Sequence, residues 1–233
     1  MKISIQKAIA SSGYASRRQA EKLIKAGQVT INDKLAMVSD RVDTEVDQVK
    51  VNGKLINTKQ DKLYLILNKP KGYTCSNRYF PGEKNIFSLI KRPERLFAVG
   101  RLDKDSRGLV LITNDGDLAL KLSHPRYEVS KEYEVRLKEK EFNLREMQQK
   151  FVSGIDIGEK RLAVAKSLSY LQNNLFSVVL REGKKRQIKR MFAKLNLTVL
   201  DLKRVSLAGI ELGKLSEGQT RELKAEELNK LLK

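Results

Sequence analysis

The sequence predicts an α+β protein with a small N-terminal module and a larger C-terminal domain, and three observations support this. Apolar residues recur with helical spacing in residues 16–26 and 186–195. Residues 57–62 are polar and charged without apolar periodicity, which places a linker there and predicts domains at residues 1–58 and 59–233. Apolar runs with the length of buried strands occupy residues 63–67, 96–99, 109–112 and 176–180.

The chain is strongly basic. Lys and Arg number 47 against 28 Asp and Glu, and this net charge of +19 predicts a phosphate-rich partner rather than a merely basic surface. No apolar run reaches the roughly 18 residues of a membrane span, and the first residues lack the layout of a signal peptide. We therefore expect a soluble cytoplasmic protein with no membrane partner. With Cys75 and His124 alone of their types, an internal disulfide and a metal site of several thiolates or imidazoles are excluded.

The N-terminal module begins with two predicted helices. The first covers residues 3–10, and the second covers residues 16–26. Ser16 and Gln19 have the spacing of a capping box, and Gly27 stands where a helix end favours positive φ. Strands and tight turns are then predicted at Val29–Ile31, Asn32-Asp33, Val49–Val51 and Asn52-Gly53.

A basic stripe is predicted on the outer face of the second helix. Residues 1–34 hold seven Lys or Arg and two Asp or Glu. The pattern from Ile5 to Asn32 resembles the small αL RNA-binding module first known from a ribosomal protein of the small subunit. That resemblance implies that the stripe contacts RNA phosphates, although an ordinary solvated helix face is the alternative. The predicted RNA-binding residues are Arg17, Arg18, Lys22 and Lys25.

The larger domain opens with a strand at residues 63–67 that leads into Lys69-Pro70-Lys71-Gly72. In this motif the proline fixes φ and the glycine permits a sharp turn, so a structural role has at least as much support as direct chemistry, and Lys69 is not predicted to be catalytic. The next strands, at residues 96–99 and 109–112, flank an irregular loop at residues 100–108. This loop holds two carboxylates, two guanidinium groups and two glycines, which is the composition of a site rather than of a core.

The remaining elements alternate between helices and strands. A helix is predicted at residues 116–122 and a strand at residues 131–137, where Tyr133 lies on the apolar face. Turn signals predict a hairpin region within residues 144–169. An amphipathic helix follows the strand at residues 176–180, and its polar side carries Arg186, Lys189 and Arg190. Residues 178–204 hold nine basic and two acidic residues and predict a second RNA-facing surface, and a last helix is expected at residues 224–232.

Several of these motifs together resemble the bacterial ribosomal-RNA pseudouridine synthases of the RsuA type. The matching segments are Lys69–Gly72, Gly100–Asp103 with Thr113–Gly116, Lys131–Tyr133 and Glu182–Met191. The resemblance implies a mixed, mostly antiparallel sheet with the loop of Asp103 opening into a cleft. It also implies that Asp103 is catalytic, that Tyr133 packs on the target base, and that Lys189 pairs with Asp103. Relatives often have arginine at the position of Lys189, and lysine lacks the bidentate fork, so Arg186 is the alternative partner of Asp103.

The implied reaction is the site-specific isomerisation of uridine to pseudouridine in ribosomal RNA. It neither gains nor loses atoms, so we expect no cofactor and no metal. The target base must leave its helix to react, and Arg101 or Arg107 would fill the gap or clamp phosphate. Further RNA contacts are expected from Lys185, Arg186 and Arg190. We expect a monomer whose partner is ribosomal RNA or a ribosomal assembly intermediate.

Two other functions fit part of the pattern. A non-catalytic RNA-binding or ribosome-assembly protein would explain the N-terminal module and the charge. It would not require a carboxylate facing a polyanion, which favours the enzyme. A DNA-binding protein is the weaker alternative, because the sequence contains neither a helix-turn-helix nor a zinc-finger signature. The sequence identifies neither the modified uridine nor the ribosomal subunit that contains it.

Overall fold

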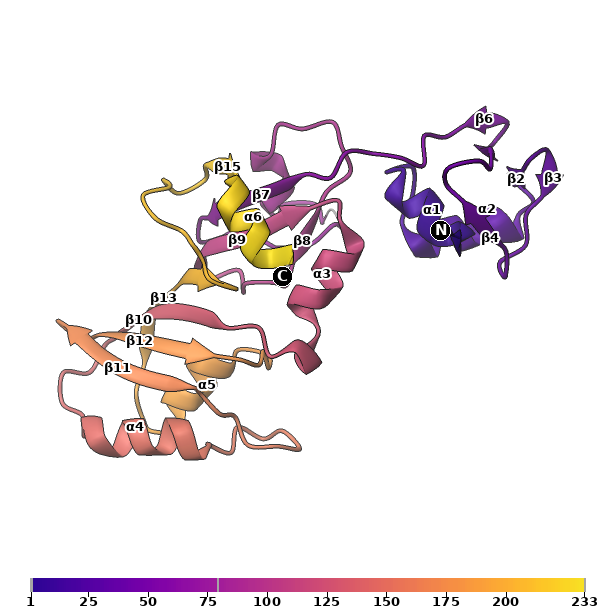
Figure 1. Cartoon of the computed structure of the whole chain (residues 1–233). Helices are drawn as coiled ribbons and strands as arrows, with labels where there is room; N and C mark the ends of the chain where they lie inside the picture. The colour runs from indigo at the N-terminus through magenta and orange to yellow at the C-terminus, as the bar shows by residue number, and fades with distance from the viewer. Residues whose placement is uncertain (1, 79, 233) are drawn as a thin grey trace. The chain divides into compact units, whose positions relative to one another are not determined.

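The computed structural model of the chain describes residues 2–78 and 80–232 and contains two compact units (Figure 1). The smaller unit extends to Leu63 and includes the short segments Arg92–Phe97 and Thr113–Gly116, and the larger unit holds the rest. The predicted domain boundary between residues 58 and 59 stays a prediction. Residues 1 and 233, which begin and end the predicted domains, lie outside the described residues.

The two helices of the smaller unit begin at side-chain caps. Helix α1 (Ile5–Ser11) follows Ser4, whose hydroxyl accepts a hydrogen bond from the Lys7 amide, so it begins two residues later than predicted. Helix α2 (Arg17–Lys25) has the predicted capping box of Ser16 and Gln19. Gly27 has a φ of +70°, as predicted for the residue that ends this helix.

A small antiparallel sheet completes this unit. Its strands run in the order β3-β2-β5-β6, and β1 pairs separately with β4. Apolar side chains of both helices and of β2 and β5 form one core, with Ile5, Ile9, Ala20 and Ile24 among its buried members. The bounds are β1 (Lys2–Ser4), β2 (Val29–Ile31), β3 (Lys34–Leu35), β4 (Arg41–Asp43), β5 (Val49–Val51) and β6 (Lys54–Leu55).

The larger unit is organised around a nine-stranded sheet in the described part of the chain. The main order is β11-β12-β10-β13-β9-β7-β15, while β14 pairs with β13 and β8 pairs with β9. Strands β9 and β13 run parallel, whereas β10 is antiparallel to both β12 and β13. The bounds are β7 (Tyr64–Lys69), β8 (Phe97–Val99), β9 (Arg107–Thr113), β10 (Lys131–Leu137), β11 (Ser167–Gln172), β12 (Leu175–Leu180), β13 (Val199–Leu207), β14 (Ile210–Glu211) and β15 (Thr220–Glu222). The predicted α+β class and the mixed, mostly antiparallel sheet are confirmed.

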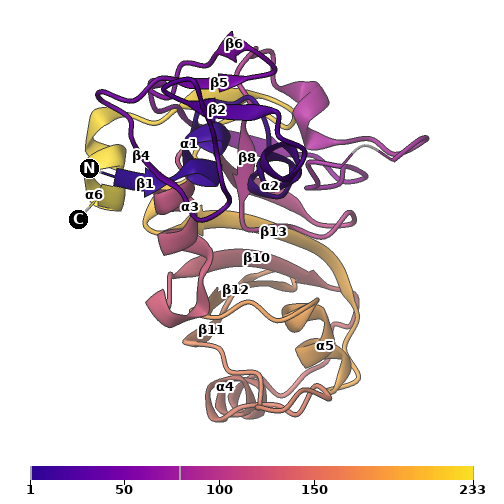
Figure 2. The same ribbon diagram turned by 90° about the vertical axis from the view of Figure 1, so that its right-hand side faces the viewer.

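Helices pack against both halves of this sheet. Helices α4 (Leu144–Ser153) and α5 (Gln187–Ala193) lie on the same side of β10 and β12 in Figure 2, and an aromatic cluster that includes Phe151 and Phe192 joins them. Helices α3 (Gly116–Ser123) and α6 (Ala225–Leu232) belong to the core around β7 and β9. Single 3₁₀ turns occur at Ile86–Leu89 and Pro125–Tyr127. Among residues 2–78 and 80–232, no helix is both long and apolar enough to cross a membrane.

The segment 144–169 differs from the prediction. A short antiparallel contact of Ile155 with Ala163 matches the expected hairpin region, but α4 precedes it and was not predicted. The sequence signal for this helix is weak, because only Met147 and Phe151 of its ten residues are buried.

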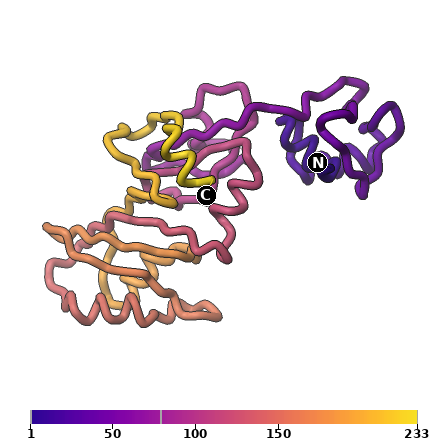
Figure 3. Tube along the Cα trace, viewed as in Figure 1, coloured from indigo at the N-terminus to yellow at the C-terminus, as the bar shows by residue number. Residues whose placement is uncertain are grey.

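Two pairings bring distant parts of the larger unit together. The C-terminal part of the chain returns to the first strand of the larger unit, because β15 pairs antiparallel with β7. The yellow and purple traces in Figure 3 follow this pairing. Strand β13 inserts between β9 and β10, so that Arg204 faces Gly108 on one side and Tyr133 on the other. The loop between β8 and β9 thereby lies at the edge of the central strands.

Candidate active site

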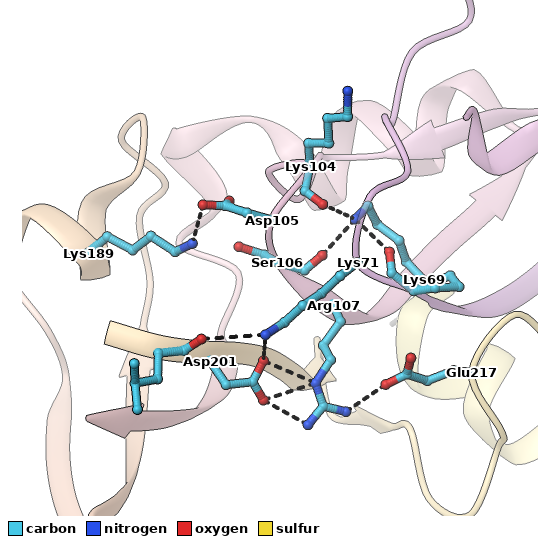
Figure 4. Close-up of polar contacts among 11 residues, drawn as sticks. Lys69, Lys71, Lys104, Asp105, Ser106, Arg107, Lys189, Asp201 and Glu217 are labelled. Atoms are coloured by element: carbon cyan, nitrogen blue, oxygen red, sulfur yellow. Dashed lines mark hydrogen bonds and ion pairs between the residues drawn. The ribbon is translucent and has the colours of Figure 1, made fainter. Parts of the chain in front are cut away.

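The loop that carries Asp103 is held from below by a buried lysine. Lys69 ends strand β7 and is fully buried. Its Nζ donates to the carbonyl oxygens of Ser106 at 2.6 Å, Pro70 at 3.0 Å and Lys104 at 3.4 Å (Figure 4). The amide of Gly72 also donates to the Lys104 carbonyl, at 2.7 Å. The motif at residues 69–72 therefore positions the loop, which is a structural role.

Burial changes the pKa of this lysine. Desolvation lowers the pKa of Lys69, while the charges of Cys75, Asp105, Asp103 and Glu217 partly oppose that effect. In the described part of the chain, the ammonium group donates to backbone carbonyls and has no carboxylate at hydrogen-bond distance. Lys69 is thus committed to the backbone of the loop and is not directed at a ligand.

A cavity of about 720 Å³ opens beside this loop in the larger unit. Its volume lies in the range of small-molecule sites in proteins. Residues of strands β8, β10, β12 and β13 and of the loops and helices around them line it, among them Arg101, Asp103, Lys131, Tyr133, Lys185 and Arg204. The cavity therefore collects a carboxylate, an aromatic ring and several cations that are far apart in the sequence.

The two carboxylates of the loop have different surroundings. Asp103 is half-buried and lines the cavity, and its carboxylate forms no hydrogen bond or ion pair within the described residues. Asp105 does not line the cavity. Its Oδ2 lies 2.7 Å from Nζ of Lys189 and 3.1 Å from Nη2 of Arg186. One carboxylate of the loop is therefore free and the other is paired.

These contacts correct the predicted partner of Asp103. Both candidate cations, Lys189 and Arg186, are paired with Asp105 instead. The reason is geometric, because Asp105 points toward Lys189 (Figure 4), whereas Asp103 lines the cavity. Burial raises the pKa of Asp105, but the hydrogen bonds from Lys189 and Arg186 outweigh this effect and hold that pKa below its usual value. The pairs anchor the loop to α5.

Tyr133, which is predicted to pack on the target base, lies in the central part of the sheet. It lies on β10, opposite Val178 of β12 and Arg204 of β13. The side chain is buried, with 8% of its surface exposed, and it lines the cavity. An aromatic ring held by two neighbouring strands offers a rigid apolar surface to a planar ligand.

Two arginines predicted to bind RNA are used inside the protein. Arg107 donates from Nε and Nη2 to Asp201 at 2.9 and 2.7 Å, and from Nη1 to Glu217 at 2.8 Å (Figure 4). Lys71 adds a further contact to Asp201 at 2.7 Å. Arg190 pairs with Glu159 at 2.8 Å and donates to the carbonyl of Ile157. Neither guanidinium group is free to clamp phosphate in this arrangement.

The other predicted RNA-binding cations are accessible. Arg101 and Lys185 are exposed at the cavity. Arg186 is exposed as well, although it pairs with Asp105. On helix α2 the exposed residues are Arg17, Arg18, Lys22 and Lys25. Of these, Lys25 forms an ion pair with Glu21 at 2.6 Å.

Comparisons with known proteins agree with this geometry. The sequence profile of the S4 domain matches residues 4–47, and that of the RNA pseudouridylate synthase family matches residues 63–194, which is more than half of the chain. The chain belongs to the RNA pseudouridylate synthase family. As a pseudouridine synthase it carries an S4 domain before its catalytic domain, as the resemblance predicted.

Individual synthases resemble the chain over nearly its whole length. Ribosomal large subunit pseudouridine synthase B of Bacillus subtilis is 37% identical to this chain, and the alignment covers 97% of this chain and 94% of that protein. An uncharacterized RNA pseudouridine synthase of Aquifex aeolicus is 40% identical and covers 100% and 95%, respectively. A crystal structure of a pseudouridylate synthase superposes with a TM-score of 0.72 at 31% identity, over 98% of this chain and 99% of that chain.

Three residues of this synthase site were missed by sequence reasoning. Asp201 and Lys131 resemble surface charges, because each stands in an alternating strand. Arg204 is more unusual, since it is 2% exposed and lies between the buried Leu202 and Leu207 of β13. A charged residue on the apolar phase of a strand is the signal that identifies it.

Proposed function

We propose that the chain converts uridine to pseudouridine at a specific site in ribosomal RNA, with Asp103 as the catalytic carboxylate. One observation carries this proposal. Within the described residues, Asp103 lines the cavity without a hydrogen-bonded or ionic partner, whereas Asp105 is held by two cations. A reacting carboxylate must be free to approach the substrate, and Asp103 meets that requirement.

The chemistry assigns a role to each side chain at the cavity. The bond between ribose C1′ and N1 of the base breaks, the base turns, and C5 then bonds to C1′. Asp103 acts as nucleophile or base in this sequence. Tyr133 stacks on the uracil once the nucleotide has been flipped out of its helix. Lys189 does not touch the substrate in this account; with Arg186 it positions the loop through Asp105.

The substrate class is supported by charge and by relatives. The Bacillus subtilis relative bears the name of a large-subunit ribosomal enzyme, and the present chain has a net charge of +19. The stripe of α2 would track RNA phosphates, and Arg101 and Lys185 would hold the nucleotide chain at the cavity. We further propose that residues 1–58 form the RNA-binding module and residues 59–233 the catalytic domain. The synthase acts as a cytoplasmic monomer on RNA or an assembly intermediate.

A tritium-release assay tests the catalytic assignment. Transcripts of the two large ribosomal RNAs are labelled with tritium at C5 of uridine, because C5 loses its hydrogen when it bonds to C1′. Wild type releases tritium, and Asp103→Asn slows the release by more than about 10³-fold. Asp105→Asn is the matched control in the same loop, and it retains measurable turnover because it loses only the anchor to α5. Equal rates of release by wild type and Asp103→Asn refute the catalytic role of Asp103. No release by wild type leaves a non-catalytic RNA-binding protein.

A further inference from the structure

Arg204 carries a buried positive charge that the protein does not satisfy. Its Nε donates to the Leu109 carbonyl at 2.7 Å, which fixes the plane of the guanidinium group. Its Nη2 is buried and has no hydrogen-bond partner among residues 2–78 and 80–232. The whole residue is 2% exposed, and no carboxylate pairs with it in the described residues. An orphaned donor on a buried charge is costly, so the position indicates a ligand that completes it.

The sheet places this arginine in the floor of the cavity. Arg204 is the register partner of Tyr133 on β10, and cross-strand partners project to the same face of a sheet. On its other side β9 approaches closely, because Gly108 has no Cβ; a Cβ there would lie 2.3 Å from the Arg204 carbonyl oxygen. Arg204, Tyr133 and Asp103 all line the cavity. The guanidinium group is therefore fixed beside the aromatic ring and shares its cavity with the free carboxylate.

The surrounding charges do not neutralise Arg204. Burial lowers the pKa of Lys131, and the charge of Arg204 lowers it further, with only Glu182 acting in the opposite sense. Glu182 itself pairs with Lys184 at 2.7 Å. Lys131 and Arg204 thus bring two cations to the cavity, and within the described residues neither forms an ion pair with a carboxylate.

We propose that Arg204 is a further catalytic residue, whose Nη2 donates to a carbonyl oxygen of the flipped uracil and stabilises negative charge on it. This inference rests on the proposed function. When the C1′–N1 bond breaks, its electron pair passes to the uracil and is shared by N1, O2 and O4. The pair then forms the C5–C1′ bond, C5 loses its proton and N1 gains one, so that atoms and charge balance. A fixed donor at O2 or O4 stabilises the charged base.

The depth of Arg204 favours a base over a phosphate as its ligand. Phosphates of a flipped nucleotide stay with the RNA backbone, where the exposed side chains of Arg101 and Lys185 lie. Arg204 is more deeply buried than Tyr133, at 2% against 8% exposure, and Tyr133 is the residue that would stack on the base. The guanidinium group of Arg204 would therefore contact the edge of a base that stacks on Tyr133.

Atomic substitution in the substrate tests the contact. The ribosomal RNA fragment that contains the modified position is synthesised with uridine, 2-thiouridine or 4-thiouridine at the target. Single-turnover rates are measured by nucleoside chromatography for wild type and Arg204→Gln. Sulfur accepts hydrogen bonds poorly, so replacing the contacted oxygen weakens the contact with Arg204. Sulfur also changes the reactivity of the base itself, but that change affects the rates of both proteins equally. The difference between the thio effects on wild type and on the variant therefore reports the contact with Arg204. Arg221→Gln is the matched control, since Arg221 pairs with Glu227 at 2.6 Å and does not line the cavity.

The expected result is specific. Arg204→Gln slows the uridine substrate by about 10²–10³-fold, with the RNA dissociation constant changed less than about threefold. One of the two thio substrates slows wild type at least about fivefold more than it slows Arg204→Gln, and Arg221→Gln behaves like wild type. Arg204→Lys, which keeps the charge, replaces Arg204→Gln in the cycle if the glutamine variant does not fold.

Other results overturn the inference. If both thio substrates slow wild type and the Arg204 variant by the same factors, Arg204 does not touch a carbonyl oxygen. If the variant weakens RNA binding without slowing the bound reaction, Arg204 holds the RNA backbone instead. If wild type forms no pseudouridine in any ribosomal RNA, the proposed function itself fails. The first two results leave the proposed function standing.

Discussion

Replacing Gly108 with alanine should destabilise the larger unit through two separate effects. Gly108 has a φ of +105°, which costs an L-residue about 1–2 kcal/mol. Its Cβ would lie 2.3 Å from the carbonyl oxygen and 2.7 Å from the amide nitrogen of Arg204, and both are backbone atoms of β13 that cannot rotate away. Overpacking of this kind costs about 1–3 kcal/mol more. We therefore expect a loss of about 3 kcal/mol, which corresponds to about 6–12 °C in Tm for a domain of this size.

The matched control for this substitution is Gly209→Ala. Gly209 also has a positive φ, of +76°, but no atom of the described residues lies within 4 Å of the position that its Cβ would take. Gly209→Ala should lower the free energy of unfolding only by the cost of the positive φ, about 1 kcal/mol, which corresponds to about 2–4 °C in Tm. Scanning calorimetry of both variants measures the difference. Equal Tm values for Gly108→Ala and Gly209→Ala would refute the steric contact of β9 with β13.

Two further predictions concern charge. Burial raises the pKa of Asp201, but hydrogen bonds from Arg107 and Lys71 hold it below its usual value, so these pairs stabilise the fold at neutral pH and lose that effect as the pH falls through the native pKa. Asp201→Asn should therefore cost about 1–2 kcal/mol at pH 7. Its Tm difference from wild type should narrow only as the pH falls below the ordinary carboxyl pKa of 3.8 toward the lower native pKa; a constant difference down to acidic pH would contradict this. For RNA binding, each alanine in the α2 stripe should reduce the slope of log K against log salt by about 0.7–0.9. The stripe variants are Arg17→Ala, Arg18→Ala, Lys22→Ala and Lys25→Ala. Lys54→Ala, at an exposed residue of β6, is the control and should leave the slope unchanged. If Lys54→Ala lowers the slope as much as the stripe variants do, the stripe is not a specific RNA-binding surface.

Features that depend on neighbouring residues were predictable from the sequence. The capping box of Ser16 and Gln19 and the positive φ of Gly27 are interactions within a few residues, so their patterns identify helix α2. The alternation around Tyr133 predicted β10 for the same reason, because one face of that strand is buried. Interactions between residues close in the sequence are therefore sufficient to predict α2 and β10.

Features that depend on distant pairing were not predictable. Asp103 and Asp105 are two residues apart, and only the fold decides which of them meets Lys189 on α5. Arg204 becomes buried because β13 lies between β9 and β10, an order that the strand patterns do not specify. The resemblance to a known family identified Asp103, but the contacts of the residues around it are determined by the folded structure.

The most direct test of the catalytic assignment is pseudouridine mapping in cells. Both large ribosomal RNAs are mapped from cells that lack this protein and are complemented with wild type, Asp103→Asn or Asp105→Asn. We predict that one or more positions lose pseudouridine, that wild type restores them, and that Asp105→Asn restores them at least in part while Asp103→Asn does not. Restoration by Asp103→Asn, or an unchanged map in cells that lack the protein, would contradict the role of Asp103 in ribosomal RNA.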